Sequence, residues 1–293
     1  MTPRETMNGQ VADYFDEDLY LEENPDVRVA IANRRQPSAF FHYLHYGQYE
    51  DRPGKPWLPN PPGYRFPGPL PPPALRRRVH NTAELNSFEW IGKTVCDDLQ
   101  REIDHRLTPT DASRILDFGC GCGRVMAYLR TAFPGSLHGT DLDPEAVAWC
   151  QQNLAAVGTF SVNQDMPPLP FDDAAFDIVY SISVFSHLPE EMQTAWLGDL
   201  RRVTKPGGYL LLSVQGEAML PIVSPETRAE FARKGFVYLQ RGGTDGLPDF
   251  YQTAFHAEPY IRDHWSEFFE IEAVVPKGVG GNQDLVVCRR PSD

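Results

Sequence analysis

The sequence predicts an α/β fold, in which helices cover both faces of a mostly parallel sheet, preceded by a small helical module. Two observations support this prediction. Short apolar runs that suit strands alternate with helix-forming segments after residue 112, and such alternation is typical of a parallel sheet. The first run, 115–118, leads into glycines at alternate positions, Gly119, Gly121 and Gly123. In open α/β sheets, ligands bind where a turn of this kind follows the carboxyl end of a strand.

The composition narrows the class of protein. A chain of 293 residues suffices for one large domain, or for a medium domain with an appendage. The formal net charge of -13 disfavours binding to nucleic-acid phosphates. The first residues lack the apolar core of a signal peptide and no apolar run reaches a membrane-spanning length, so we expect a soluble cytoplasmic protein. The five cysteines suggest no disulfide framework, and Cys120 and Cys122 lack the second Cys or His pair of a metal site.

Residues 1–52 are predicted to form the helical module. Apolar positions favour a helix over 14–31, broken at Pro25, and a second helix over 40–46 that ends at Gly47, where a glycine suits the C-cap.

A set of positions in this module follows a recognisable spacing: Phe15, Asp16, Tyr20, Leu21, Asn24, Pro25, Asp26, Val27, His42, Tyr43, Leu44, Gly47, Arg52 and Pro53. The pattern resembles a small helical repeat of bacterial proteins that build or modify surface glycans. This resemblance implies a module that binds a partner protein or a glycan, rather than one that performs chemistry. A helical cap that only buries one face of its neighbour is the alternative.

A proline-rich linker is predicted over 53–73, where ten of 21 residues are proline. It separates the module from a domain at 74–293, whose first part, 74–111, is predicted to be a helical cap with a helix over 75–106. In that helix Arg78, Asn81 or Trp90 could contact a ligand, or the helix could simply pack on the sheet.

The elements of the domain follow in order. Strands are predicted at 114–118, 136–140, 158–163, 176–181 and 208–214, and helices at 124–132, 144–154 and 190–203. The tail departs from this alternation, with a helix at 257–268 and strands at 269–276 and 283–289. The short joining segment Lys277-Gly-Val-Gly-Gly281 favours a hairpin, so the sheet is expected to end in an antiparallel strand.

The glycine turn is not a dinucleotide fingerprint, because Arg124 stands where that pattern places its third glycine. Two carboxylates follow the second strand. Asp143 precedes Pro144 and a helix, which suits an N-cap with proline at N1. Asp141 has no such structural task, and a carboxylate there can accept hydrogen bonds from both ribose hydroxyls.

The third strand ends at Asp165 and Met166. A side chain here can bond the exocyclic amine of an adenine, while the methionine packs on the face of the ring. With the glycine turn and the carboxylate of the second strand, this order indicates a nucleoside-containing cofactor.

Five short motifs follow one another between residues 112 and 290. They are Leu116-Asp-Phe-Gly-Cys-Gly-Cys-Gly123, Gly139-Thr-Asp141, Pro168-Leu-Pro-Phe-Asp-Asp-Ala-Ala-Phe-Asp-Ile-Val-Tyr180, Ser186-His-Leu-Pro189 and Lys205-Pro-Gly-Gly208. With them the chain resembles the class I S-adenosylmethionine-dependent methyltransferases. The resemblance implies a Rossmann-like seven-stranded sheet, mostly parallel with an antiparallel last strand, and S-adenosylmethionine as the cofactor.

The resemblance also implies roles for single residues. The glycine turn would approach the methionine moiety, with Asp117 ordering it from beneath, and Ser181 and Ser183 would lie near the sulfonium. The expected cofactor-binding set is Asp117, Gly119, Cys120, Gly121, Asp141, Leu142, Asp165, Met166 and Ser181.

Methyl transfer is an in-line displacement that depends mainly on positioning, but an alcohol acceptor must also lose a proton to a base. His187, in the loop after the fourth strand, is one candidate, although a structural histidine is the alternative. Tyr251 and His256 are candidates from 250–256, where the family usually builds its acceptor pocket, although a plain strand also fits that segment. Asp284 could reach the same cleft.

No metal is expected, because the spacing of Asp245, Asp249 and Asp284 fits no metal-site template. The residues after the fourth strand read Ser-Ile-Ser-Val over 181–184, not the Asn/Asp-Pro-Pro-Tyr of enzymes that methylate nucleobases. The paired glutamates of arginine methyltransferases are not evident. These absences favour O-methylation of a sugar or small-molecule hydroxyl, with a mild preference for a saccharide. The alternatives are N- or C-methylation of a small natural product and a non-catalytic cofactor-binding scaffold.

Overall fold

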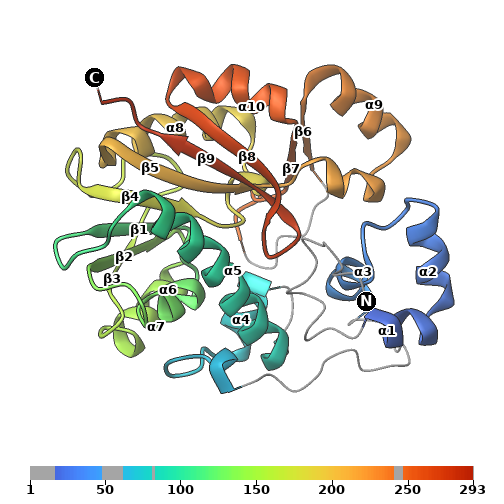
Figure 1. Ribbon diagram of the computed structural model, residues 1–293, viewed down its shortest axis with the longest axis horizontal. Coiled ribbons are helices and arrows are strands. Elements are labelled where there is room, and N and C mark those ends of the chain that lie inside the picture. Colours follow the sequence, from blue (N-terminus) through green and yellow to red (C-terminus); the bar gives the residue numbers. More distant parts are fainter. Residues whose placement is uncertain (1–16, 48–61, 81–82, 241–246, 293) are drawn as a thin grey trace.

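The computed structural model describes residues 17–47, 62–80, 83–240 and 247–292 (Figure 1). A seven-stranded sheet in the order β3-β2-β1-β4-β5-β9-β8 forms its centre. The strands are β1 (Arg114–Phe118), β2 (Ser136–Asp141), β3 (Thr159–Val162), β4 (Phe176–Ser181), β5 (Thr204–Val214), β8 (Glu270–Val279) and β9 (Gln283–Arg289). The first five pair in parallel, whereas β9 runs antiparallel to both of its neighbours, β5 and β8. The predicted mostly parallel sheet with an antiparallel last strand is confirmed.

The predicted hairpin at the end of the chain is also confirmed, although its turn is tighter than expected. β8 continues to Val279, so that Gly280 and Gly281 make the reversal with positive φ angles of 59° and 65°. Such angles favour glycine.

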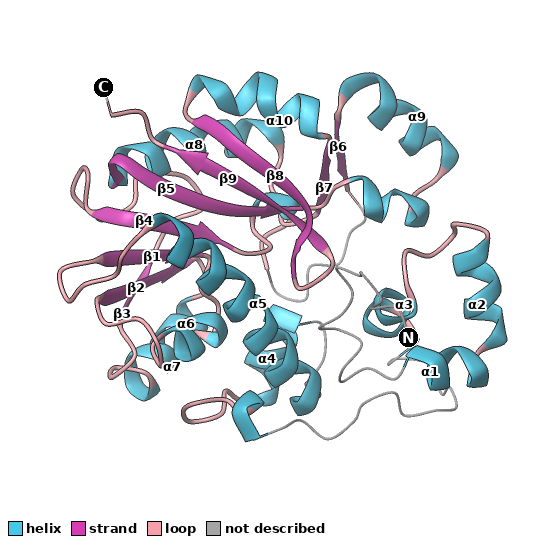
Figure 2. Ribbon diagram, in the orientation of Figure 1, coloured by secondary structure: helices cyan, strands magenta, loops and turns pink. Residues whose placement is uncertain are grey.

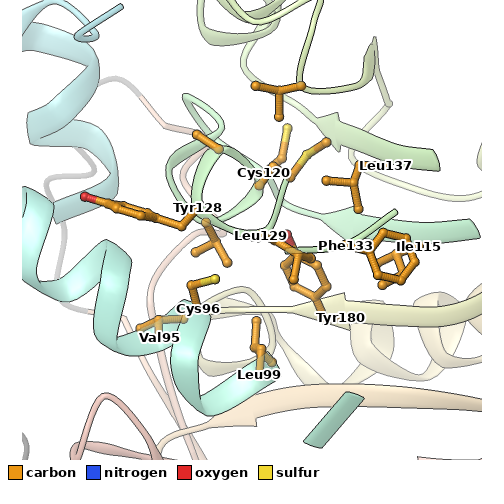
Figure 3. Close-up of a cluster of buried hydrophobic side chains, with 14 of the residues drawn as sticks. Val95, Cys96, Leu99, Ile115, Cys120, Tyr128, Leu129, Phe133, Leu137 and Tyr180 are labelled. Carbon is orange, nitrogen blue, oxygen red and sulfur yellow. The ribbon is translucent and has the colours of Figure 1, made fainter. Parts of the chain in front are cut away.

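Helices cover both faces of the sheet (Figure 2). These are α6 (Arg124–Leu129) and α7 (Pro144–Asn153) on one face, and α8 (Glu190–Val203) and α10 (Glu258–His264) on the other. Within β1, Ile115 joins the core under α6, while its neighbour Leu116 joins the core under α8. Successive side chains of a strand point to opposite faces, so this strand contributes apolar side chains to the cores on both faces of the sheet. Figure 3 shows the first core, where Leu99 and Leu129 meet Ile115 and Tyr180.

The single helix expected over 75–106 was wrong. Two helices occupy this stretch, α4 (Pro73–His80) and α5 (Leu85–Arg106). The carboxylate of Glu84 accepts hydrogen bonds from the N–H groups of Asn86 and Ser87, at 2.8 and 2.5 Å, and so caps the start of α5. Because first-turn N–H groups lack partners within the helix, this cap favours a new start at that point.

Part of the predicted linker packs on the domain. Pro62–Tyr64 forms a 3₁₀ helix, and Phe66 is only 7% exposed, with its ring 5.6 Å from that of Phe88 and 5.8 Å from that of Tyr128. The last part of the predicted linker is therefore ordered and contains a short helical turn. Residues 53–61 lie outside the described residues.

The N-terminal helices are α1 (Glu17–Glu23), α2 (Pro25–Ala32) and α3 (Ala39–His45). The break at Pro25 is confirmed, with this proline at N1 of α2. The ring of Phe40 packs edge-on against Trp90 of α5 at 5.1 Å. The adjacent Phe41 joins an apolar cluster with Phe231 and Phe255 of the C-terminal part. The helices of this module, blue in Figure 1, thus pack on two separate parts of the domain.

Between β5 and α10 the chain forms an additional small unit. It contains a 3₁₀ helix, Glu217–Ile222, then α9 (Pro225–Lys234), and an antiparallel pair of β6 (Phe236–Leu239) and β7 (Thr253–His256). In the part of the chain that the structure describes, no helix is both long and apolar enough to span a membrane.

Candidate active site

A cavity of about 450 Å³ lies at the carboxyl ends of β1, β2 and β4. Its wall comes from the glycine turn, the end of β2, the loop after β4, helix α4 and the segment before β7. The structure brings these predicted residues together in that wall: Asp117, Gly119, Cys120, Gly121, Asp141, Leu142, Ser183, His187 and Tyr251.

The glycine turn has the backbone that the sequence indicates. Gly119, Gly121 and Gly123 have φ angles of 85°, 51° and 71°. A Cβ atom at Gly119 would lie 2.2 Å from Val184 Cγ2, and one at Gly121 would lie 2.4 Å from Val79 Cγ1. Glycine is therefore required at both positions for conformation and for space.

The carboxylate of Asp141 holds this turn in place. Its Oδ2 accepts a hydrogen bond from the Gly121 N–H at 2.7 Å, and its Oδ1 accepts one from the Asp143 N–H at 2.9 Å. The expectation that Asp141 has no structural task was wrong. Burial raises the pKa of this carboxyl, against the opposing effect of these hydrogen bonds. A carboxylate oxygen can accept more than one bond, so capacity for a ribose diol remains.

Asp143 caps α7 as predicted, because its Oδ1 accepts the N–H groups of Glu145 and Ala146 at 3.0 and 3.2 Å. Its Oδ2 pairs with Arg78 Nη1 at 2.7 Å, and Arg78 Nη2 pairs with Glu145 at the same distance. Through these two ion pairs, Arg78 links α4 to the start of α7 at the cavity wall. Of the other ligand contacts considered for this region, Trp90 is fully buried against Phe40, and Asn81 lies outside the described residues.

Asp117 stands in β1, two residues before the first glycine of the turn, and it lines the cavity. Its Oδ2 accepts a hydrogen bond from the Tyr180 hydroxyl at 2.8 Å. Burial raises the pKa of Asp117 to about 8, and the nearby charge of Asp141 acts in the same direction. The Asp117 carboxyl is therefore mainly protonated at neutral pH.

Three predicted cofactor residues are not brought to the cavity wall. Ser181 is fully buried, and its hydroxyl donates to the Phe118 carbonyl at 2.8 Å. Asp165 and Met166 are exposed, beyond the end of β3. Asn163 lines the cavity instead, with its Oδ1 accepting from the Thr140 hydroxyl at 2.9 Å.

His187 stands in the cavity wall with a defined orientation. Its Nδ1 is hydrogen-bonded to the Gln252 carbonyl, and its ring stacks on that of Tyr251 at 4.4 Å and 19°. Because a carbonyl only accepts, Nδ1 carries the proton, and Nε2 is the acceptor nitrogen of the neutral ring. Burial lowers the pKa of His187, which favours this neutral form.

Tyr251 is a proton donor in this structure, since its hydroxyl donates to the Ser183 carbonyl at 2.6 Å. Burial raises its pKa well above the ordinary range. This arrangement suits a residue that supports His187 more than one that removes a proton.

His256 and Asp284 do not line the cavity. His256 is 1% exposed, its Nε2 lies 2.8 Å from Gln193 Oε1, and burial lowers its pKa to about 3. Asp284 accepts the Lys277 N–H at 2.8 Å. Neither residue therefore extends into the cleft, contrary to expectation. β7 fits the alternative, in which this segment is an ordinary strand.

Among the described residues, no three His, Cys, Asp or Glu side chains are grouped as a metal site. Asp245, one of the three aspartates considered for a metal, lies outside those residues.

Arg124 is a wall residue that sequence reasoning missed. It follows the glycine turn and lines the cavity, and its Nε and Nη1 atoms are buried with no hydrogen-bond partner among the residues that the structure describes. The signal was present in the sequence, because a cation directly after the turn can face the same ligand.

Residues 115–208 match the family model described as a methyltransferase domain. Over 97 residues the chain is 36% identical to the probable phthiotriol/phenolphthiotriol dimycocerosates methyltransferase 2 of Mycobacterium ulcerans. This matching stretch covers 33% of this chain and 37% of that protein. It is 35% identical over 102 residues to a fatty-acid O-methyltransferase of Mycolicibacterium smegmatis, covering 34% and 36% of the two chains. The match thus spans little more than a third of the length of these curated relatives.

Among solved structures, a S-adenosylmethionine-dependent methyltransferase from Methanosarcina mazei matches with a TM-score of 0.49 and 20% sequence identity, covering 66% of this chain and 98% of that one. Over residues 115–208, this chain is therefore similar to a methyltransferase domain and to proteins that bear the names of methyltransferases.

Proposed function

We propose that this protein transfers a methyl group from S-adenosylmethionine to an oxygen of a small, lipid-like molecule, with His187 as the base. One observation carries the proposal. A histidine with a fixed tautomer and a lowered pKa shares one cavity with the glycine turn and Asp141. Cofactor binding and proton removal can therefore occur side by side.

The residues of the cavity fit the cofactor. The turn at Gly119 and Gly121 exposes backbone without side chains, and Asp141 retains capacity for ribose hydroxyls. The unpaired N–H groups of Arg124 suit an anionic group. When bound, S-adenosylmethionine supplies a methyl group that is attached to a sulfonium sulfur. The rest of the cofactor would leave as a neutral thioether once the methyl group is transferred.

His187 would accept the proton of an acceptor hydroxyl at Nε2 as the new C–O bond forms. The stacked ring of Tyr251 and the Gln252 carbonyl hold the imidazole for this transfer. Positioned general bases contribute about 10²- to 10⁴-fold to rate. A carboxylate acceptor is already ionised at neutral pH and would need no base.

A lipid-like acceptor is proposed ahead of the saccharide that the sequence favoured. The relatives bear names of enzymes acting on dimycocerosates and on fatty acids. The acceptor side of the cavity carries apolar groups from Ile182, Val184 and Met219, next to the polar side chains of Gln215 and Gln283. This mixture suits a hydroxyl or carboxyl group at the end of an apolar chain.

The N-terminal module is proposed to support the acceptor wall as a cap. Phe41 of α3 packs in one cluster with Met219, whose side chain lines the cavity. This contact favours the cap over a separate module that binds a partner protein or a glycan. The boundaries 1–52, 53–73 and 74–293 remain predictions.

A transfer assay tests the proposal. Methyl-labelled cofactor is supplied with a long-chain alcohol, a fatty acid or a glycoside, and label in each acceptor is measured for wild type and His187→Ala. We expect the wild-type protein to label the alcohol or the fatty acid. The His187→Ala variant should lose the labelling of the alcohol but keep that of the fatty acid. Label only in the glycoside would overturn the lipid-like class. Cofactor binding without transfer to any acceptor would favour a scaffold.

A further inference from the structure

Two glutamines occupy facing positions where the sheet borders the cavity. The antiparallel register of β5 and β9 pairs Val214 with Asp284, so the next residues along, Gln215 and Gln283, stand opposite each other. Side chains at opposite positions of an antiparallel pair lie on the same face, with Cβ atoms about 4.5–5.5 Å apart. Both glutamines line the cavity, and we call them the carboxamide pair.

Gln215 has a fixed backbone, whereas its side chain makes no hydrogen bond within the described residues. The Gln215 carbonyl accepts the His256 N–H at 2.8 Å, and Gln215 forms a bridge with Phe255 of β7. The residue is 9% exposed. An amide buried to this extent without a partner is costly, and an apolar side chain would fill the position at lower cost. Of its two polar side-chain atoms only Oε1 is closed off, so Nε2 is the atom that a ligand in the cavity can reach.

Gln283 presents its amide in the same sense. Its Oε1 accepts a hydrogen bond from the Ser183 hydroxyl at 3.1 Å, which leaves the two N–H groups of Nε2 for the cavity. Ser183 is itself held firmly, because its N–H donates to Ser213 Oγ at 2.8 Å and its carbonyl accepts the Tyr251 hydroxyl at 2.6 Å. The orientation of the Gln283 amide is therefore fixed by a serine whose own backbone is bonded on both sides.

The carboxamide pair lies close to the proposed base. Tyr251 bonds the Ser183 carbonyl and stacks its ring on that of His187 at 4.4 Å. From Gln283 to His187, the series of contacts thus passes through only two residues, Ser183 and Tyr251. An acceptor whose hydroxyl lies at His187 Nε2 can therefore reach the amides with an atom close to that hydroxyl.

We propose that the carboxamide pair binds a second, uncharged oxygen of the acceptor, on the carbon adjacent to the one that carries the methylated hydroxyl. The Nε2 atoms of Gln215 and Gln283 donate to this oxygen. The assignment rests on the proposed function and names its substrate class as lipid-like molecules with two neighbouring oxygens, either vicinal diols or hydroxy-ketones. Uncharged donors beside the apolar side chains of Ile182 and Met219 suit such an oxygen, because an ionised group would be poorly solvated there.

The test compares three acceptors of one chain length, each supplied with methyl-labelled S-adenosylmethionine. Decanol has a single oxygen, the vicinal decanediol has a second hydroxyl on the adjacent carbon, and the corresponding hydroxy-ketone has a carbonyl at that carbon. Steady-state kinetics give kcat/KM for wild type, Gln215→Met, Gln283→Met and the double variant. Methionine is similar in length to glutamine but lacks the amide.

Asn163→Ala is the matched control. Asn163 is a carboxamide of the same cavity, but its Oδ1 accepts from the Thr140 hydroxyl at 2.9 Å and its Nδ2 donates to the Gln164 carbonyl at 2.6 Å. Circular dichroism and thermal melting establish that each variant is folded.

We expect wild type to favour the diol and the hydroxy-ketone over decanol by about 5- to 100-fold in kcat/KM, since each hydrogen bond to the second oxygen contributes up to about tenfold. Each single variant should lower this ratio by roughly 2- to 10-fold, and the double variant should abolish the preference. Asn163→Ala should leave the ratio unchanged. Because both values of a ratio come from the same variant, a general loss of activity cancels.

Equal kcat/KM for all three acceptors in the wild type would overturn this inference alone, as would a preference that survives in the double variant. A preference for the diol that does not extend to the hydroxy-ketone would also overturn it, because N–H donors bind both kinds of oxygen. If the double variant does not fold, the same ratio in the single variants decides. Transfer to decanoic acid alone would overturn this inference and leave the proposed function standing, whereas transfer to none of the four compounds would overturn both.

Discussion

The two walls of the cavity differ in how the chain builds them. The cofactor wall uses two short stretches, 117–124 and 141–143, linked by backbone bonds such as that from Gly121 to Asp141. The acceptor wall assembles groups that are distant in sequence, as where His187 meets Gln252 and Tyr251 meets Ser183. A wall built from adjacent residues can be predicted from the sequence pattern. A wall built from distant segments depends on how those segments pack together. The two walls should therefore respond separately to mutation.

The largest expected effect isolates the acceptor wall. His187→Ala should lower kcat for an alcohol acceptor by about 10²- to 10⁴-fold, because the base is lost. Binding of S-adenosylhomocysteine should stay within a few-fold of wild type. Steady-state kinetics and calorimetry measure the two quantities. His256→Ala is the comparison variant, since this histidine lies outside the wall, and an equal loss of kcat in both variants would contradict the assignment.

The cofactor wall should show the opposite separation. Asp141→Asn should weaken S-adenosylhomocysteine binding by about 10- to 100-fold, because a charged acceptor of hydrogen bonds becomes a neutral amide. With saturating cofactor, kcat should recover most of its wild-type value. Unchanged binding would show that Asp141 serves only the turn.

The glycine turn predicts a smaller effect on stability. Gly119→Ala places a Cβ at a φ of 85° and 2.2 Å from Val184 Cγ2. Left-handed backbone costs a non-glycine residue about 1–2 kcal/mol, so the free energy of unfolding should fall by at least about that amount. Urea denaturation measures it. Gly198→Ala, inside α8 with its nearest neighbour at 3.7 Å, is the control and should not destabilise.

The last expected effect is a dependence of stability on pH. The pKa of Asp117 is raised from 3.8 to about 8 in the folded protein. Between these values the folded state holds a proton that the unfolded state has lost, so this group's stabilisation is complete below pH 4 and is lost as pH rises toward 8. Asp117→Asn keeps an acceptor for Tyr180 and should make the decline of unfolding free energy shallower. An identical slope in denaturation curves from pH 5 to 8 would contradict the shift.

Sequence patterns predicted the elements that local chemistry determines. Asp143 with Pro144 identified the start of α7, and the alternate glycines identified the turn, because caps and positive φ angles depend on a few adjacent residues. The parallel pairing of the first five strands followed from their alternation with helices. The same reasoning supplied most of the residues that line the cavity at the glycine turn and at the end of β2.

The misses depended on tertiary structure. Asn163, rather than Asp165, reaches the cavity because β3 ends at Val162, and the end of a strand is set by pairing with its neighbour. His256 and Tyr251 share one segment, yet only the tyrosine lines the cavity. The unpaired state of Arg124 becomes visible only when its surroundings are known. Sequence spacing contains none of this information.

The most direct test of the account is calorimetric titration of the wild-type protein with S-adenosylhomocysteine, with NAD as the control ligand. The account predicts saturable one-site binding of S-adenosylhomocysteine and none of NAD. Absence of S-adenosylhomocysteine binding by a folded protein, or equal binding of NAD, would contradict the assignment of this cavity.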